Sequence, residues 1–273
     1  YCDPQGLPEL RRELVNYLHF SRGVRCCADQ IILTSGHQYS LSLVARLFSG
    51  GNWKFAMEEP GYDGTRTVMQ QNRFSPIPIP LEKDGVSIAE TERLSHTLLY
   101  ITPSHQFPMG SVLPITKRLA LLQWAAKSDS YILEDDYDSE LRYHSLPIPS
   151  LQSIDTNDRT IYMGTFSKSL SPDLRIAYLV LPEQLLGRYR TAFPCANCTV
   201  PSLLQDALMQ FLHSGEYQKH INAIRTHCRK KHDYILNYVR ENLSGQAVLS
   251  GSDAGLHFIL TLQHDFRGSD PIQ

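Results

Sequence analysis

The 273-residue sequence has no long hydrophobic run and no excess of one charge, and each absence excludes a class of protein. No apolar stretch reaches the ~20 residues of a membrane-spanning helix, and no basic-then-apolar secretory leader opens the chain. Lys and Arg number 26 and Asp and Glu 28, which gives a net charge of −2. Because nucleic-acid-binding domains usually carry a basic excess, we do not expect this chain to bind DNA by itself.

Cysteine is also scarce. Six cysteines in a chain of this length do not form a disulfide framework. The pair Cys195-x-x-Cys198 lacks the second pair that a four-cysteine metal site needs, and Cys26 and Cys27 are adjacent and poorly spaced to supply it. We therefore expect reduced thiols in a cytoplasmic protein without a metal site and without membrane contact.

Short apolar segments alternate with helix-length amphipathic segments along the first two thirds of the chain. The short segments are β-branched or aromatic and are bounded by turn residues, which predicts buried strands. The alternation predicts an α/β fold with a mostly parallel central sheet flanked by helices. The expected strands cover residues 31–33, 97–102, 131–133, 160–163 and 176–181, and the expected helices cover 8–19, 39–48 and 114–126.

The pattern changes after residue 181. Helices are expected over residues 202–212 and 216–242, the second with a long apolar stripe, and a further strand over 256–262. We therefore expect a large domain over 1–204, followed over 205–273 by an interdomain helix and the start of a smaller α+β domain. Because the chain starts at Tyr rather than Met and ends soon after the last expected strand, we expect it to be part of a longer protein.

Lys168 lies among small and hydroxylated residues directly after the expected strand 160–163. The end of such a strand faces the crevice where α/β sheets bind ligands. A lysine whose pKa is lowered by desolvation can attack an aldehyde and form a Schiff base. Taken alone, however, the segment favours an ordinary solvated loop lysine.

An acidic cluster over residues 134–138 follows the expected strand 131–133. Neighbouring acids repel one another, so they require either solvent or a cation. A solvated loop would satisfy them, and so would a protonated pyridine ring paired with Asp135, with the phenol of Tyr137 nearby. Parallel strands would bring Asp135 and Lys168 to the same edge of the sheet.

Two further segments carry weaker signals. A strand–glycine–helix junction presents free amides to an anion such as phosphate, and Gly36, His37 and Gln38 are the candidate donors, although Ser and Gly are also common helix caps. A Pro-Gly turn leaves Tyr62 without an apolar periodicity that would bury it. Its ring either packs in the turn or stacks on a flat ligand.

Together these groups supply an amine, a counter-ion for a pyridine nitrogen, a phenol, a stacking ring and a phosphate cradle. That set matches pyridoxal 5′-phosphate. A nucleotide-binding α/β protein that holds phosphate at residues 34–38 is the alternative from another class. It gives Lys168 and Asp135 no role, and the chain has no Walker A lysine motif.

Several motifs also occur in a fixed order across most of the chain. They are YCDPQGLPEL at 1–10, SGHQ at 35–38, EPGYD at 59–63, TPSHQFPMG at 102–110, EDDYDSE at 134–140 and GTFSK at 164–168. In these motifs the sequence resembles fold-type-I pyridoxal-phosphate enzymes of the aspartate aminotransferase superfamily. More narrowly, it resembles the aminotransferase-like domain of MocR-type regulators in the GntR superfamily.

The resemblance implies a role for each candidate residue. Lys168 would hold the cofactor as an internal aldimine and act as the base of a 1,3-proton shift. Asp135 would keep the pyridine nitrogen protonated, Tyr137 would hydrogen-bond the ring's phenolic oxygen and Tyr62 would stack on the ring. The phosphate would be held by Gly36, His37, Gln38, Thr165, Ser167 and Arg175.

The sequence departs from the aminotransferase pattern at two places. Residues 107–110 read FPMG where many aminotransferases have Asn-Pro-x-Gly. The asparagine that touches the ring oxygen is therefore missing, and His105 and Gln106 are open as substitutes. The arginine that grips a substrate carboxylate is expected beyond the end of this chain, with Arg66 and Arg225 as alternatives within it.

Two functions share this chemistry. The first is an effector-sensing domain that forms an external aldimine with an amino compound and passes that state to a winged helix-turn-helix domain, which this chain lacks. The second is a free-standing aminotransferase that acts on an amino acid, and turnover is left open. The resemblance favours the first and implies a homodimer that binds DNA only through the missing N-terminal domain, whereas the identity of the amino compound is not predicted.

Overall fold

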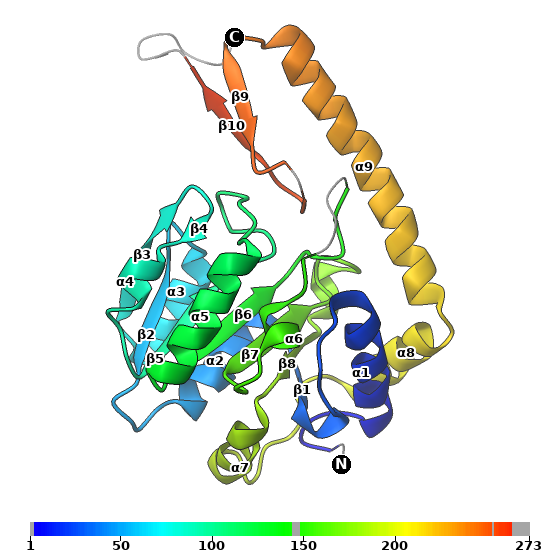
Figure 1. Ribbon diagram of the computed structural model, residues 1–273. Helices are drawn as coiled ribbons and strands as arrows, with labels where there is room; N and C mark the ends of the chain where they lie inside the picture. The colour runs from blue at the N-terminus through cyan, green and yellow to red at the C-terminus, as the bar shows by residue number, and fades with distance from the viewer. Residues whose placement is uncertain (1–2, 144–147, 253, 264–273) are drawn as a thin grey trace.

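The structure is a computed structural model that describes residues 3–143, 148–252 and 254–263. An eight-stranded sheet carries helices on both faces, and a long helix leads from it to a two-stranded ribbon (Figure 1). The strands of the sheet are β1 (Ile31–Thr34), β2 (Lys54–Glu59), β3 (Pro76–Glu82), β4 (Gly85–Val86), β5 (Thr97–Ile101), β6 (Tyr131–Asp136), β7 (Thr160–Thr165) and β8 (Ala177–Val180). The helices are α1 (Pro8–Arg22), α2 (His37–Leu47), α3 (Asp63–Gln71), α4 (Ile88–Thr91), α5 (Ile115–Lys127), α6 (Leu151–Ile154), α7 (Glu183–Ala192), α8 (Ser202–His213) and α9 (Glu216–Asn242), and the ribbon is β9 (Ala247–Ser250) and β10 (Ile259–Leu262).

The strand order is β1-β8-β7-β6-β5-β2-β3-β4. Strands β3, β2, β5, β6 and β7 run parallel, whereas β8 is antiparallel to both of its neighbours and β4 is antiparallel to β3. The predicted α/β fold with a mostly parallel sheet is confirmed. The strands predicted to begin at residues 31, 97, 131, 160 and 176 are also confirmed. Their observed ends lie within two residues of the predicted ends, except for β6, which extends to Asp136.

Strands β2 and β3 were not predicted from the sequence. Strand β3 carries proline at positions 76, 78 and 80, and a proline removes the N–H that a strand donates to its neighbour. Residues that alternate along a strand point their amides to the same side. The three prolines therefore turn away from β2, and Ile77 and Ile79 keep their amides for pairing with it.

The strands bury side chains on both faces, as the parallel arrangement requires. Leu133 of β6 packs on one face with residues of α2, α3 and α7. Ile132 points to the opposite face, where α4, α5 and α6 cover one half of the sheet. Helices α1 and α8 and the start of α9 cover the other half of that face (Figure 1). None of the described helices combines the length and hydropathy that a membrane span requires.

Strand β6 continues this alternation into its acidic end. The side chain of Asp136 is buried on the face of α1, where its Oδ2 lies 2.6 Å from Arg22 Nε and accepts a hydrogen bond from Tyr162 at 2.6 Å. Burial by itself would raise the pKa of Asp136, but the charge of Arg22 and the hydrogen bonds hold that pKa below its usual range. Arg22 is the last residue of α1, so this ion pair fixes the end of the helix to the sheet.

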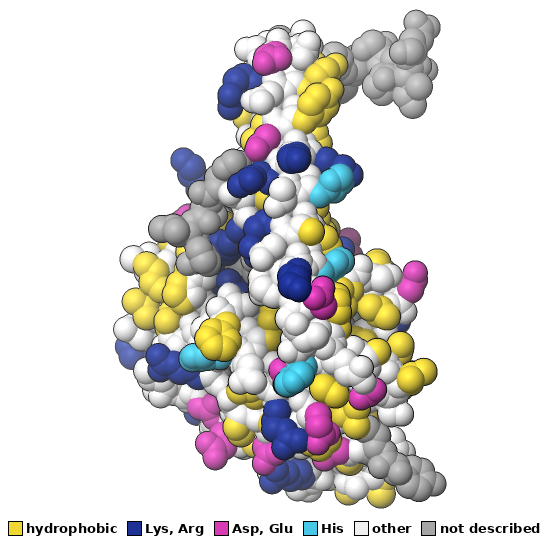
Figure 2. Space-filling model, turned by 90° about the vertical axis from the view of Figure 1, so that its right-hand side faces the viewer, with side chains coloured by type: hydrophobic (Ala, Val, Ile, Leu, Met, Phe, Trp, Pro, Cys, Tyr) yellow, Lys and Arg dark blue, Asp and Glu magenta, His cyan; other side chains and the backbone are white. Residues whose placement is uncertain are grey.

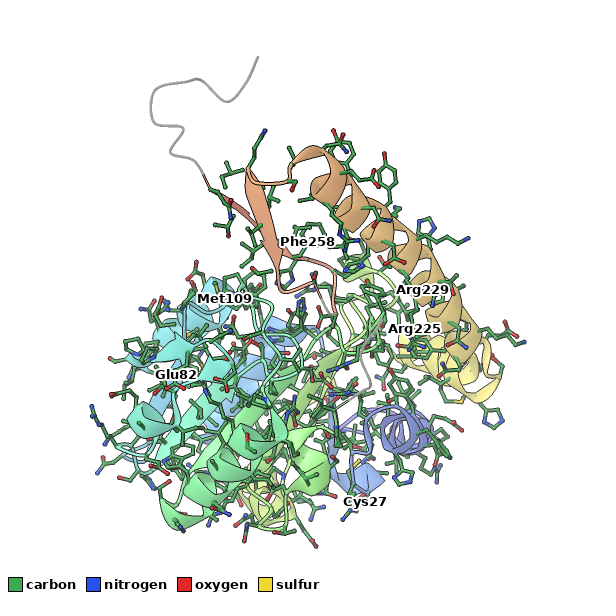
Figure 3. The ribbon with its side chains drawn as sticks, turned by 45° about the horizontal axis from the view of Figure 1, so that its top comes forward. Cys27, Glu82, Met109, Arg225, Arg229 and Phe258 are labelled. Atoms are coloured by element: carbon green, nitrogen blue, oxygen red, sulfur yellow. The ribbon has the colours of Figure 1, made fainter. Side chains whose placement is uncertain are left out.

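Helix α9 rises away from the sheet and ends beside the ribbon, and Figure 2 shows basic side chains along the column that it forms. The predicted strand 256–262 begins only at Ile259, and the unpredicted β9 precedes and pairs with it. Phe258 lies between the ribbon and α9, with its ring 6.4 Å from that of His232 (Figure 3). The division into a large domain over 1–204 and a smaller one over 205–273 stays a prediction.

The Arg22–Asp136 pair generates a stability prediction. We expect Arg22→Gln to lower the free energy of unfolding by about 3–5 kcal/mol, because it leaves a buried carboxylate unpaired. Arg12→Gln, which removes the exposed ion pair with Glu9, should cost less than about 1 kcal/mol. Urea unfolding of both variants measures the difference, and equal losses would contradict the importance of the buried pair.

Candidate functional site

A cavity of about 440 Å³ lies where β6 and β7 end, beside the start of α2. The parallel pairing of these strands sets Asp135 opposite Met163, five residues before Lys168. Side chains from the main sheet and from the segment before β10 meet here. The lining residues are His37, Gln38, Tyr62, Tyr100, Thr102, Phe107, Asp135, Tyr137, Thr165, Ser167, Lys168, Pro172, Arg175, Leu256 and His257.

Asp135 is buried on the α2 face of β6, opposite in direction to Asp136. Its Oδ2 lies 2.7 Å from His37 Nε2 and also accepts a hydrogen bond from the hydroxyl of Tyr100. Its Oδ1 is buried and has no hydrogen-bond partner among the described residues. A buried carboxylate oxygen without a partner is costly, so this atom is suited to accept a hydrogen bond from a ligand.

Lys168 lies in a turn after β7 and is solvent-accessible on the cavity side. Its amine has no hydrogen bond or ion pair with any described residue. The turn itself is held by α9, because the Tyr217 hydroxyl lies 2.9 Å from Ser169 Oγ and His220 Nε2 lies 2.9 Å from Ser169 O. The amine therefore has no partner among the described residues, while the backbone of its turn is anchored.

The start of α2 forms the polar end of the cavity. Gly36 precedes the helix with a φ of 90°, and a Cβ there would lie 2.6 Å from Arg175 Nη2. The intrahelical bonds begin with Tyr39 and Ser40, so the first amides of the helix are open to a ligand. Arg175 itself has a φ of 49°, a strained conformation of the kind that occurs at binding sites.

Two hydroxyl residues stand beside this helix end. Thr165 is the last residue of β7, and its Oγ1 accepts a hydrogen bond from Ser167 N at 3.1 Å. Both residues line the cavity together with Arg175. The guanidinium, the helix amides and the two hydroxyls form one cluster of donors, which is the composition of a phosphate site.

Tyr62 covers the cavity from the start of α3. Its ring meets those of His37 and Phe107 edge to face, with centroids 5.9 and 5.6 Å apart. A Cβ on Gly64 would lie 2.5 Å from the Tyr62 ring, so the absence of a side chain at Gly64 lets the ring lie flat against the backbone.

Of the two proposed substitutes for the missing asparagine, Gln106 does not line the cavity. Its amide nitrogen donates to Pro60 O and to Phe107 O, at 3.0 and 2.7 Å, and thereby holds the surrounding loop together. His105 is buried behind Tyr137, whose hydroxyl donates to His105 O at 2.9 Å. Neither side chain is therefore among those that line the cavity.

The two arginines considered for a substrate carboxylate also lie outside the lining. Arg66 is paired with Glu59 and Asp63. Arg225, which Figure 3 labels on α9, donates from Nε to Glu140 O at a distance of 2.9 Å.

The structure thus brings together at this one cavity the ten residues to which the resemblance assigns a role at the cofactor, nine of them in its lining and Gly36 next to Arg175. Sequence reasoning missed Tyr100, Thr102 and His257. Tyr100 and Thr102 lie at the end of β5, the strand next to β6, and that position was a usable signal. His257 comes from a distant segment, and no local pattern marked it.

Comparison with known proteins assigns the class. Residues 1–265 match the family Aminotransferase class I and II, and the chain belongs to this family. Among solved structures it is similar to the Pyrococcus horikoshii kynurenine aminotransferase, with a TM-score of 0.84 and 26% identity over 97% of this chain and 67% of that one. It is also similar to an archaeal alanine:glyoxylate aminotransferase, with a TM-score of 0.86 and 26% identity over 99% of this chain and 68% of that one.

Curated relatives narrow the class to the aminotransferase-like domains of transcriptional regulators. The chain is 40% identical to the uncharacterized HTH-type transcriptional regulator YdeL of Bacillus subtilis, over 97% of the chain and 57% of the relative. It is 35% identical to the probable rhizopine catabolism regulatory protein MocR of Rhizobium meliloti, over 93% of this chain and 52% of the relative. It is 33% identical to the HTH-type pyridoxine biosynthesis transcriptional regulator PdxR of Corynebacterium glutamicum, over 94% of this chain and 55% of the relative. The chain spans little more than half the length of these relatives.

The family and its structural neighbours imply pyridoxal 5′-phosphate as the cofactor, as the sequence predicted. The residues present fit that group. The free Asp135 Oδ1 matches a protonated ring nitrogen, the unpaired amine of Lys168 matches an aldehyde, and the donors around Gly36 match a phosphate.

The opposite orientations of Asp135 and Asp136 generate a paired prediction. Asp135→Asn should weaken cofactor binding by roughly tenfold or more, because it removes a charge-assisted hydrogen bond of about 1.5–3 kcal/mol. Asp136→Asn should lower thermal stability but leave the visible spectrum of the bound cofactor unchanged. Absorbance titration at a temperature where both variants are folded makes the test, and a spectral effect of Asp136→Asn alone would overturn the assignment.

Proposed function

We propose that the chain binds pyridoxal 5′-phosphate through Lys168 and senses an amino compound as the effector domain of a transcriptional regulator. The observation that carries this proposal is that Lys168 and Asp135 line one cavity, and that the Lys168 amine and Asp135 Oδ1 each have no hydrogen-bond partner among the described residues. Relatives named as HTH-type regulators, one of them a regulator of pyridoxine biosynthesis, support the regulatory part.

In this proposal each group of the cavity has a defined task. Lys168 Nζ would bind the aldehyde of the cofactor, and the same amine would serve as the base that moves a proton beside it. Asp135 Oδ1 keeps the ring nitrogen protonated, with His37 and Tyr100 fixing the carboxylate through its other oxygen. The cofactor, when bound, supplies an electron sink for charge that develops beside the amino group.

The remaining residues bind and orient. Tyr62 covers one face of the ring, and Tyr137, whose pKa is raised by burial, presents a neutral hydroxyl to the phenolic oxygen. The phosphate would be held by the amides of His37 and Gln38 at the start of α2 and by the side chains of Thr165, Ser167 and Arg175. The Gly36 amide donates to Thr34 O at 2.8 Å, so Gly36 contributes by leaving room for the Arg175 guanidinium.

We extend the proposal to a longer protein of the same kind as these regulator relatives. DNA is bound by a part outside this chain, the aminotransferase-like domain assembles as a homodimer, and the protein acts in the cytoplasm. The sensed ligand is an amino acid or another primary amine, because only such a group exchanges with a lysine at an aldehyde.

The first test concerns the attachment point. Borohydride treatment of the cofactor-loaded chain should fix a mass adduct on Lys168, and Lys168→Ala should abolish both the adduct and the visible absorbance band. Lys117→Ala is the matched control, because Lys117 is held by Glu82 and Asp84 away from the cavity. An adduct on another lysine, with none on Lys168, would overturn the proposal.

The second test separates a sensor from an enzyme. The full-length protein is titrated with a panel of amino acids and amines while absorbance, affinity for its promoter DNA and release of keto product are recorded. A sensor should show a saturable spectral shift and a changed DNA affinity, with fewer product molecules than protein molecules. Steady release of product without a change in DNA affinity would favour the free-standing aminotransferase instead.

A further inference from the structure

Tyr137 lines the cavity and is backed by two buried titratable side chains, His105 and Asp138. Its hydroxyl lies 2.9 Å from His105 O and 3.3 Å from His105 Nδ1. That nitrogen lies 2.8 Å from Asp138 Oδ2, and both His105 and Asp138 are 1% exposed in their side chains. We propose that Asp138 and His105 are positioning residues that act through Tyr137, an inference that rests on the proposed cofactor site.

The geometry supports action through the phenol. The Asp138 carboxylate accepts from Nδ1 and fixes the rotation of the His105 ring, much as a carboxylate orients a catalytic histidine. The same nitrogen and the His105 carbonyl both contact the Tyr137 oxygen, so that oxygen has two fixed neighbours. Neither His105 nor Asp138 lines the cavity, and their effect on a ligand is therefore indirect.

The segment that precedes β10 packs against His105 and Asp138. A Cβ on Gly255 would lie 2.0 Å from His105 Nδ1 and 2.4 Å from Asp138 Oδ2, so the glycine backbone packs directly onto the pair. His257 lies with its ring centroid 4.3 Å from that of His105, and its Nε2 lies 3.2 Å from Pro108 O. Residues that precede β10 thereby exclude water from the chain of hydrogen bonds behind Tyr137.

The same three side chains, His105, Asp138 and His257, are close enough together to be considered as metal ligands. Their existing contacts favour positioning over metal binding. His105 Nδ1 is bound to Asp138, His105 Nε2 lies 3.4 Å from Gly251 O, and His257 Nε2 faces Pro108 O. A metal ion would have to replace these hydrogen bonds, whereas the positioning role uses them as they are.

A double-mutant cycle tests the proposal on the cofactor-loaded chain. The readout is the midpoint of the pH titration of the visible absorbance band, which reports on the hydrogen bond at the ring's phenolic oxygen. Asp138→Asn and His105→Gln should each shift this midpoint by about half to one pH unit, the size expected for one weakened hydrogen bond. In the Tyr137→Phe background the same two changes should produce no further shift.

The chain offers a matched control in a second His–Asp pair. His96 Nδ1 lies 3.4 Å from Asp129 Oδ2, and both residues precede their strands, β5 and β6, at the ends away from the cavity. Asp129→Asn should therefore leave the midpoint unchanged. Two variants are used so that failure of one to fold, seen by circular dichroism, leaves the other to decide. Addition of zinc to the unmodified chain should not shift the midpoint.

The outcomes separate the two proposals. Full and undiminished shifts in the Tyr137→Phe background would show that His105 and Asp138 act independently of the phenol and would overturn the inference. No shift from either variant in the folded, loaded chain would also overturn it while leaving the proposed function intact. Absence of a visible band in the unmodified chain would refute the cofactor site itself and the inference with it.

Discussion

The structure depends on the burial of consecutive carboxylates at the end of β6. The alternation of a strand sends Asp135 to the face of α2 and Asp136 to the face of α1, and each requires a partner of its own. The Oδ2 of Asp136 is paired with Arg22 and fixes α1 to the sheet, while its Oδ1 is buried without a partner among the described residues. Asp135 likewise has one oxygen without a described partner, but its side chain lines the cavity. One residue of register thus separates a structural ion pair from a carboxylate that faces the cavity.

The same constraint affects the acids nearby. Burial raises the pKa of Glu134 to about 7, although main-chain amides at the start of α6 donate to both of its oxygens. Burial likewise raises the pKa of Glu58 to about 7, and Thr102 donates to it through both its amide and its hydroxyl. These two carboxyls brace the strand ends through their hydrogen bonds and do not line the cavity, so Asp135 is the acid of this cluster that faces it.

Much of this arrangement was predictable because it follows from local patterns. Short apolar strands next to Asp135 and Lys168 predict a parallel pair, and a parallel pair brings their ends together. Strand β3 was missed because its prolines normally argue against a strand. They are tolerated because β4 pairs with β3 only at Leu81 and Glu82, so no strand pairs with the side of β3 to which the prolines turn. Strand β9 was missed for a related reason. The segment over β9 is short and half exposed, so its apolar pattern is weak.

The contacts of His105 illustrate what local patterns do not contain. Its partners are Tyr137 and Asp138 on the loop after β6 and His257 on a segment about 150 residues away, and no periodicity relates them. Helix α9 creates this proximity. Near its start, Tyr217 and His220 hold the turn that carries Lys168, and Arg225 holds the loop after β6. Near its other end, α9 packs against β9, the strand whose connection to β10 lies over His105. Helix α9 therefore contacts the lysine turn, the loop after β6 and strand β9, and it links three segments that lie far apart in the sequence.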